Sequence, residues 1–252
     1  MSYMTNKSET HSTPGDTNEF ATTHWSVVLS AGSPESTRYQ EALERLCQTY
    51  WFPIYAYLRR KGYGANSAED HTQGFFTHMI EMQDLCQADP NRGRFRSFLL
   101  SMLKHFMADQ WDRSQAQKRG GGKKVLSLDF ADAETRYKLE PSHQLSPDKL
   151  FEKSWALAVL DQTMAQLKAE SSGTRRQTLF ENLKAHLAGQ SNTVPYRELA
   201  TKLEMTEGAI KVAVHRLRQR YRELLREHIA QTVSGPEQIE DEIRALFVAL
   251  AS

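Results

Sequence analysis

The segment from residue 206 to residue 230 has apolar residues at steps of four and three, which is the spacing of one buried stripe along an α-helix. Thr206 is a suitable N-cap for this helix, because its hydroxyl can accept a hydrogen bond from a backbone N–H of the first turn. Residues 195–203 predict a shorter helix just before it. Two helices joined by so tight a turn predict a helix-turn-helix. The stripe of the longer helix consists of Ile210, Val214, Leu217, Tyr221 and Leu224.

A second face of the longer helix is basic, since lysine, histidine and arginine recur there within about 60° of one another. A helix in the major groove can use such side chains on phosphates or guanine edges, and small residues at its start allow close approach. The alternative for a basic face is a solvated surface that suits the helix dipole, and Glu223 and Glu227 dilute its charge. We expect DNA contacts from Thr206, Glu207, Gly208, Lys211, His215, Arg216 and Arg218.

Helical periodicity covers most of the remaining chain, so we predict an all-α fold of two small helical domains, the second containing the helix-turn-helix. The clearest break is Lys118–Lys124, where three consecutive glycines make a regular element costly. Pro53 is expected to kink or split the first long helix, and Ser67 to cap the next one. Only residues 26–29 and 125–128 could form strands.

The predicted division of the chain follows from these breaks. The C-terminal segment has an apolar stripe that we expect to fold back on the second domain, with a partner surface as the second choice. The units are a disordered tail (1–19), an N-terminal extension (20–37), a first helical domain (38–117), a flexible basic linker (118–147), a second helical domain (148–230) and a C-terminal helix (231–252).

Composition excludes several classes of protein. The formal net charge of the 252 residues is only +1, so the position of the charges must decide any case for nucleic acid. Cys47 and Cys86 are too few for a disulfide framework and unlike a zinc spacing, and we expect small buried side chains in a reducing cytosol. The N-terminus has no apolar core and no segment approaches the roughly 18 apolar residues of a membrane span. The expected location is cytoplasmic, without membrane insertion.

No sequence motif of catalysis is present. Gly120–Lys124 lacks the spacing of a phosphate-binding loop. His71 and His78 share a helix face, but seven residues at about 1.5 Å each place them roughly 10 Å apart, too far to share one zinc ion directly. We therefore expect no enzyme activity, no cofactor and no metal site.

Residues 92–119 interleave basic groups with aromatic side chains. Phe95, Leu99 and Phe106 belong to a core stripe, and the basic residues lie around it. Such a helix can track a phosphate backbone and stack unpaired bases, as binding of single-stranded DNA requires. For Trp111 itself we expect a role in packing rather than in base stacking.

Several segments of the sequence, taken together and in their order along the chain, resemble the extracytoplasmic-function (ECF) sigma factors, specifically the planctomycete-type group. The resemblance covers residues 20–250. The segments on which the resemblance rests are FATTHWSVVLSAG, LCQTYWFPIYAYLRRKGY, AEDHTQGFF, DPNRGRFRSFLLSMLKHF, KRGGGKK and YRELATKLEMTEGAIKVAVHRLRQRYRELLREHI.

The resemblance implies a sigma factor whose first domain docks on the clamp of the largest RNA polymerase subunit and helps open the −10 promoter element. Its second domain would read the −35 element and touch the polymerase flap, and the linker would run toward the RNA exit channel. The expected partners are core RNA polymerase, promoter DNA, and an anti-sigma factor or kinase as regulator. The residues carried over are Asp70, Gln73 and Phe76 for the polymerase clamp, and Arg94, Arg96, Lys104, His105, Asp109 and Arg113 for the −10 element.

This chain departs from the family pattern at three places. The family usually has Leu-x-Gln-Glu where this chain ends in Gln73-Gly74, which removes a glutamate expected to contact polymerase. A glycine inside a helix also costs about 1 kcal/mol relative to alanine. His105 replaces a common asparagine, and Glu204 replaces the glycine usual in the turn. The other interpretation is a helix-turn-helix repressor or activator that does not recruit core polymerase, which would normally bind a palindrome as a dimer.

Overall fold

The computed structural model describes residues 39–82, 84–89, 93–116, 128, 130–139, 145–187, 194–230, 233 and 235–251. All regular elements in these ranges are helical, which confirms the predicted all-α class. The tail, the N-terminal extension, the glycine-rich segment and nearly all of the two candidate strands lie outside the described residues.

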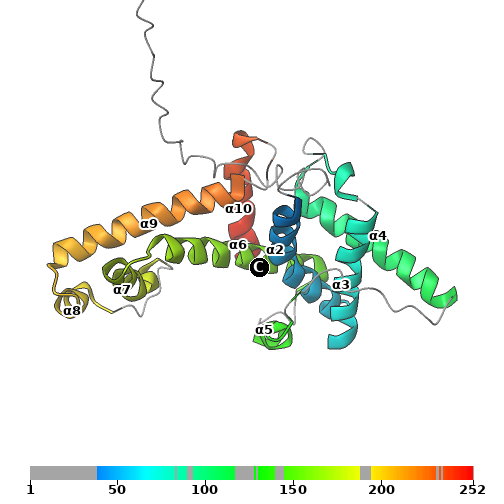
Figure 1. Ribbon diagram of the computed structural model, residues 1–252, viewed down its shortest axis with the longest axis horizontal. Coiled ribbons are helices and arrows are strands. Elements are labelled where there is room, and N and C mark those ends of the chain that lie inside the picture. Colours follow the sequence, from blue (N-terminus) through cyan, green and yellow to red (C-terminus); the bar gives the residue numbers. More distant parts are fainter. Residues whose placement is uncertain are drawn as a thin grey trace, which may run out of the picture.

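The helices are arranged in an elongated molecule with two ends (Figure 1). Helices α2, α3 and α4 form one end, α7 and α8 lie at the other, and α6 and α9 run side by side between them. The elements are α2 (Tyr39–Arg60), α3 (Ala65–Glu81), η1 (Asp84–Gln87), α4 (Phe95–Ala116), α5 (Ala133–Leu139), α6 (Pro147–Glu170), α7 (Thr174–Leu183), η3 (Lys184–His186), α8 (Tyr196–Lys202), α9 (Glu207–Ala230), η4 (Pro236–Gln238) and α10 (Ile239–Leu250).

Helix α6 connects the two ends because it packs along both α2 and α9. It begins where the sequence supplies a cap: the Ser146 hydroxyl accepts a hydrogen bond from the Lys149 N–H at 3.3 Å, and Pro147 occupies the first turn. Phe151 and Trp155 of α6 are fully buried in the largest hydrophobic cluster. The core of the first helices therefore continues into residues that we expected to belong to the second domain.

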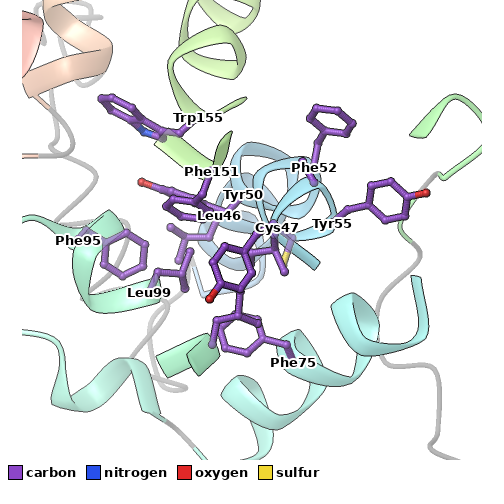
Figure 2. Close-up of a cluster of buried hydrophobic side chains, with 14 of the residues drawn as sticks. Leu46, Cys47, Tyr50, Phe52, Tyr55, Phe75, Phe95, Leu99, Phe151 and Trp155 are labelled. Atoms are coloured by element: carbon purple, nitrogen blue, oxygen red, sulfur yellow. The ribbon is translucent and has the colours of Figure 1, made fainter. Parts of the chain in front are cut away.

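The largest cluster is centred on α2 and is rich in aromatic side chains (Figure 2). Helix α2 supplies Tyr50, Phe52 and Tyr55, and α3, α4 and α6 close around them. Cys47 lies among them with 1% of its surface exposed, and burial raises the pKa of its thiol to about 12. The prediction of a small buried side chain is confirmed for Cys47, since a thiol held neutral in this way is a poor nucleophile.

A split of α2 at Pro53 and a cap of α3 at Ser67 were wrong expectations. Helix α2 is continuous through Pro53, so of the expected kink or split only the split is excluded. The neighbouring side chains of Phe52 and Ile54 are buried, and their packing outweighs the lost backbone hydrogen bond. Ser67 does not cap α3, which begins two residues earlier with Gly64 at the N-cap.

The expected linker contains a helix that the sequence pattern did not indicate. Helix α5 docks on α2, where the Glu134 carboxylate accepts hydrogen bonds from Arg59 at 2.9 Å and from the Tyr55 hydroxyl at 2.8 Å. The guanidinium of Arg136 lies 4.1 Å from the centre of the Phe52 ring. The hydrogen bonds from Arg59 hold the pKa of Glu134 below its usual range. The described part of the linker is thus an ordered helix held by tertiary contacts.

The far end of the molecule has two smaller clusters. One joins Leu183 of α7 and Leu199 of α8 to Ile210 and Val214 of α9. The other joins α6, α7 and α9. In the described ranges, none of the helices has the length and hydropathy needed to span a membrane, and no group of His, Cys, Asp and Glu side chains could hold a metal ion.

Candidate nucleic-acid interface

The turn between α8 and α9 fixes how the two helices meet. The Met205 N–H donates to the Ala200 carbonyl at 2.9 Å, and the Thr206 hydroxyl accepts from the Ala209 N–H at 3.1 Å. The predicted N-cap at Thr206 is therefore confirmed. Glu204 has a φ of +53°, which makes it the one non-glycine residue of the described chain in the left-handed region. The glycine usual in the family at this position would adopt this conformation without the steric cost of a Cβ.

Replacing Glu204 with glycine is expected to raise the free energy of unfolding by about 1 kcal/mol, because the left-handed conformation costs L-residues roughly 1–2 kcal/mol. Urea denaturation measures the change. The control is Glu198→Gly, in the helical backbone of α8, which should lower the free energy of unfolding by about 1 kcal/mol. Equal losses in both variants would contradict a strained turn.

The first half of α9 has one buried face and one open face. Ile210 and Val214 pack against α7 and α8, whereas Lys211, His215 and Arg216 are exposed. Lys211 pairs with Glu207 one turn earlier at 2.8 Å, and this hydrogen bond lowers the pKa of the glutamate. Thr206, Glu207 and Gly208 are exposed at the start of the helix. Six of the seven expected −35 contacts thus share one accessible surface.

Arg218, the seventh, has a different position from the one expected. Its Nε and Nη2 groups donate to the His186 carbonyl at 3.1 and 2.7 Å, so its guanidinium fastens η3 to α9. Arg220, two residues further, pairs with Glu170 of α6 at 2.7 Å and also with Glu223 and Glu227. The hydrogen bond to Glu170 is the main reason that the pKa of Arg220 is raised. The basic residues of α9 before residue 217 are therefore open, whereas Arg218 and Arg220 hold the fold together.

A cavity of about 820 Å³ lies between α3, η1 and α4 at the other end of the molecule. It brings together Arg94, His105 and Asp109, three of the six residues expected at the −10 element. Sequence reasoning did not assign its aromatic lining to the site. The signal that could have assigned them to the site was their spacing, because the phenylalanines lie at helical intervals from these polar residues. The aromatic residues that line the cavity are Phe75, Phe98 and Phe106.

The other three −10 candidates are not part of this cavity. Lys104 is directed to the start of α6, where it pairs with Asp148 at 2.5 Å. Arg96 is 4% exposed and its Nε donates to Glu152 at 2.5 Å, so it is not at the surface as expected. Burial is the main reason that the pKa of Arg96 is lowered. The side chain of Arg113 lies outside the described residues.

The expected polymerase-binding segment lies on α3. Asp70 is exposed and Gln73 is half-buried, as a docking surface requires. Phe76 is 1% exposed and packs in the main core, so its side chain supports the surface and is not available for contact. Gly74 faces α4, and a Cβ there would lie 3.5 Å from the Phe106 ring, an ordinary contact distance. The backbone of α3 does not require a glycine.

Replacing Gly74 with alanine is expected to raise the free energy of unfolding by about 1 kcal/mol, because alanine restricts the unfolded chain and its methyl group fits. Urea denaturation is the measurement. Gly64→Ala, at the N-cap of the same helix, is the control and should bring no gain. A loss of stability in the Gly74 variant would mean that α3 and α4 cannot accommodate the methyl group.

Comparison with protein families identifies the chain. Residues 71–227, from the middle of α3 to near the end of α9, match the family model of the ECF sigma factors. The match covers more than half of the 252 residues, and the chain belongs to the ECF sigma factor family. It is therefore a transcription factor that binds DNA and directs RNA polymerase to promoters, and it is not an enzyme. No curated protein and no solved structure matches the chain.

Proposed function

We propose that α8 and α9 form a helix-turn-helix that reads the −35 element, while α3 and α4 hold the opened −10 element. The observation that carries this assignment is the open face of α9. Lys211, His215 and Arg216 are exposed in the first turns of the helix, whereas Ile210 and Val214 are buried. A helix with this division can enter the major groove by its N-terminal half while α8 supports it from behind.

The cavity beside α4 supports the −10 assignment. Its volume is within the usual range of ligand pockets, and the partly buried Phe98 offers a ring surface for an unstacked base, while Phe75 and Phe106 form the buried wall behind it. His105 and Asp109 can form hydrogen bonds to a base edge, and Arg94 can pair with the phosphate beside it. Opening of the duplex would therefore be stabilised by capture of a base from the separated strand.

Two surfaces support binding to core polymerase. Asp70 and Gln73 lie on the outer side of α3, where the clamp would dock. A second cavity of about 720 Å³ lies beside α9 and includes Leu179, Val212 and Leu217 in its lining. Val212 is 50% exposed, which is unusual for a valine on a packed helix, and the polymerase flap would cover it.

The finer assignments from the sequence belong to the same proposal. The sequence segments that resemble ECF sigma factors support the planctomycete-type group, and they support two domains, residues 38–117 and 148–230, acting on separate promoter elements. The protein would work in the cytoplasm, where its polymerase and promoter partners are. An anti-sigma factor or a kinase would act as its regulator.

Transcription with purified components tests this function. The full chain is added to bacterial core RNA polymerase with a library of randomised promoters, and the transcribed templates are sequenced. We expect two conserved elements at one fixed spacing. Asp70→Ala should weaken binding to core polymerase, and Asp132→Ala, an exposed aspartate before α5, should leave it unchanged. A chain that binds a palindrome as a dimer and does not bind core polymerase at low salt would be a repressor or activator instead.

A further inference from the structure

Glu242 of α10 is a buried acidic residue at a position where the helix would otherwise bury an apolar one. Its neighbours on the same face are Ile239, Ile243 and Leu246, which pack against the main core. Glu242 is 1% exposed. Burial of a carboxylate costs free energy unless the charge is paired, so the partners of Glu242 indicate its role.

The partners of Glu242 are two arginines at the start of α4. Its Oε2 atom lies 2.9 Å from Nε of Arg94, and its Oε1 atom pairs with Nη1 of Arg96. Arg96 is also stacked on Trp155 of α6, with 4.2 Å between its Cζ atom and the ring centre. Arg94 remains partly exposed and lines the cavity that we assign to the −10 element. The C-terminal helix therefore reaches the edge of that cavity.

We propose that α10 is an autoinhibitory helix, in which the Glu242 carboxylate occupies the arginines that would otherwise bind a phosphate of the opened −10 strand. This inference rests on the function proposed above. A carboxylate and a phosphate use the same arginine donors, so the two cannot be bound by Arg94 and Arg96 at once. Single-stranded DNA then binds this end of the molecule only when α10 has moved away from α4.

The rest of α10 is attached in a way that suits a movable element. Leu246 and Ala249 are buried, and Arg226 of α9 pairs with Glu240 near the start of the helix. The opposite face carries Phe247 and Val248, which are 56% and 68% exposed. Within the described residues, α10 packs against the core through the face that bears Leu246 and Ala249, and α10 lies beyond the residues that match the family model.

Binding of single-stranded DNA in the absence of polymerase tests the inference. The probe is a fluorescein-labelled oligonucleotide of mixed sequence, and its fluorescence anisotropy is measured at low salt with the full chain. Glu242→Gln removes the charge but keeps the shape. If one tenth of the molecules are open in the unchanged protein and the variant is fully open, the variant should bind about tenfold more tightly, because apparent affinity scales with the open fraction. The control is Asp241→Asn, which removes one negative charge from the exposed side of α10 and breaks a pair with Arg244 of the same helix, and it should bind as the unchanged protein does.

A second variant separates release of α10 from a simple change of charge. Leu246→Ala weakens the packing of α10 but leaves all charges in place, and it should raise the affinity as well. Faster hydrogen exchange of the α10 amides would show that the helix has been released in both variants. Arg94→Ala combined with Glu242→Gln should lose the gain.

Equal DNA affinity of the unchanged protein and Glu242→Gln, with circular dichroism showing both folded, would overturn the autoinhibitory role. Promoter-specific transcription by the unchanged protein would in that case leave the proposed function intact. Absence of both transcription and DNA binding in all variants would overturn the proposed function together with this inference.

Discussion

Replacing Arg216 with alanine is expected to weaken promoter binding by about 1–3 kcal/mol, which is roughly 5- to 150-fold. Arg216 is exposed on the open face of α9, and no ion pair or hydrogen bond within the described residues engages its guanidinium. All of its binding capacity is therefore available for a phosphate or a guanine edge. Lys211 should show a smaller loss, because its ammonium already pairs with Glu207 and this pair must rearrange on DNA.

Competition binding of the polymerase complex to promoters with an intact or altered −35 element measures this effect. If Arg216 reads a base, its removal should also reduce the preference for the intact element. If it contacts a phosphate, binding should weaken equally on both promoters and depend less on salt. Arg244→Ala is the matched control, since Arg244 is exposed on α10 and, among the described residues, its guanidinium bonds only within the same helix, to Asp241 and to the Glu240 carbonyl. Unchanged binding by both Arg216→Ala and Lys211→Ala would mean that another face of α9 meets the DNA.

Arg218→Ala is expected to disturb the fold and not to remove a direct contact with DNA. This difference from Arg216 could not be predicted from the sequence. Both arginines lie on a basic helix at neighbouring positions, and their sequence signals are alike. The structure separates them, because the guanidinium of Arg218 bonds the His186 carbonyl, which is distant in the sequence. Periodicity locates a helix face, but only the tertiary fold decides which of its charges already have partners.

The elements that sequence analysis predicted well are those specified locally. Helix α9 follows from its apolar stripe and its start from the Thr206 hydroxyl, and the departure from the family glycine at 204 coincides with the positive φ of the turn. Helix α5 was missed because its seven residues have no apolar stripe, and it depends on the distant Arg59. The burial of Arg96 was missed for the same reason, since its partners come from α6 and α10.

Glu242 is a case in which the sequence did contain a signal. An acidic residue at a core position of an amphipathic helix predicts a buried pair or a surface that meets a cation. The apolar stripe of the C-terminal helix was recognised in the sequence, and α10 does pack back on α9. No conclusion was drawn from Glu242 within that stripe. Its partners at the start of α4 could not be found by periodicity, because nothing in the local pattern links residue 242 to residues 94 and 96.

Replacing Trp155 with alanine is expected to lower the free energy of unfolding by about 3–5 kcal/mol. The indole is fully buried in the main core, and its removal leaves a large cavity between α6 and the helices of the first end. The loss should be near the upper limit, because the Arg96 guanidinium also stacks on this ring at 4.2 Å. Urea denaturation measures the total effect, and hydrogen exchange locates it.

The helices that lose hydrogen-exchange protection in Trp155→Ala are as informative as the loss of free energy of unfolding. Trp155 lies within the second domain of the predicted division, yet it packs in the core built around α2. We therefore expect the amides of α2 and α4 to lose protection in the variant. Leu179→Ala is the control, because this half-buried side chain packs in the distal cluster of α7, α8 and α9 and should leave α2 protected. If Trp155→Ala leaves the exchange of α2 unchanged and costs less than about 1 kcal/mol, the first helices fold as a domain independent of α6.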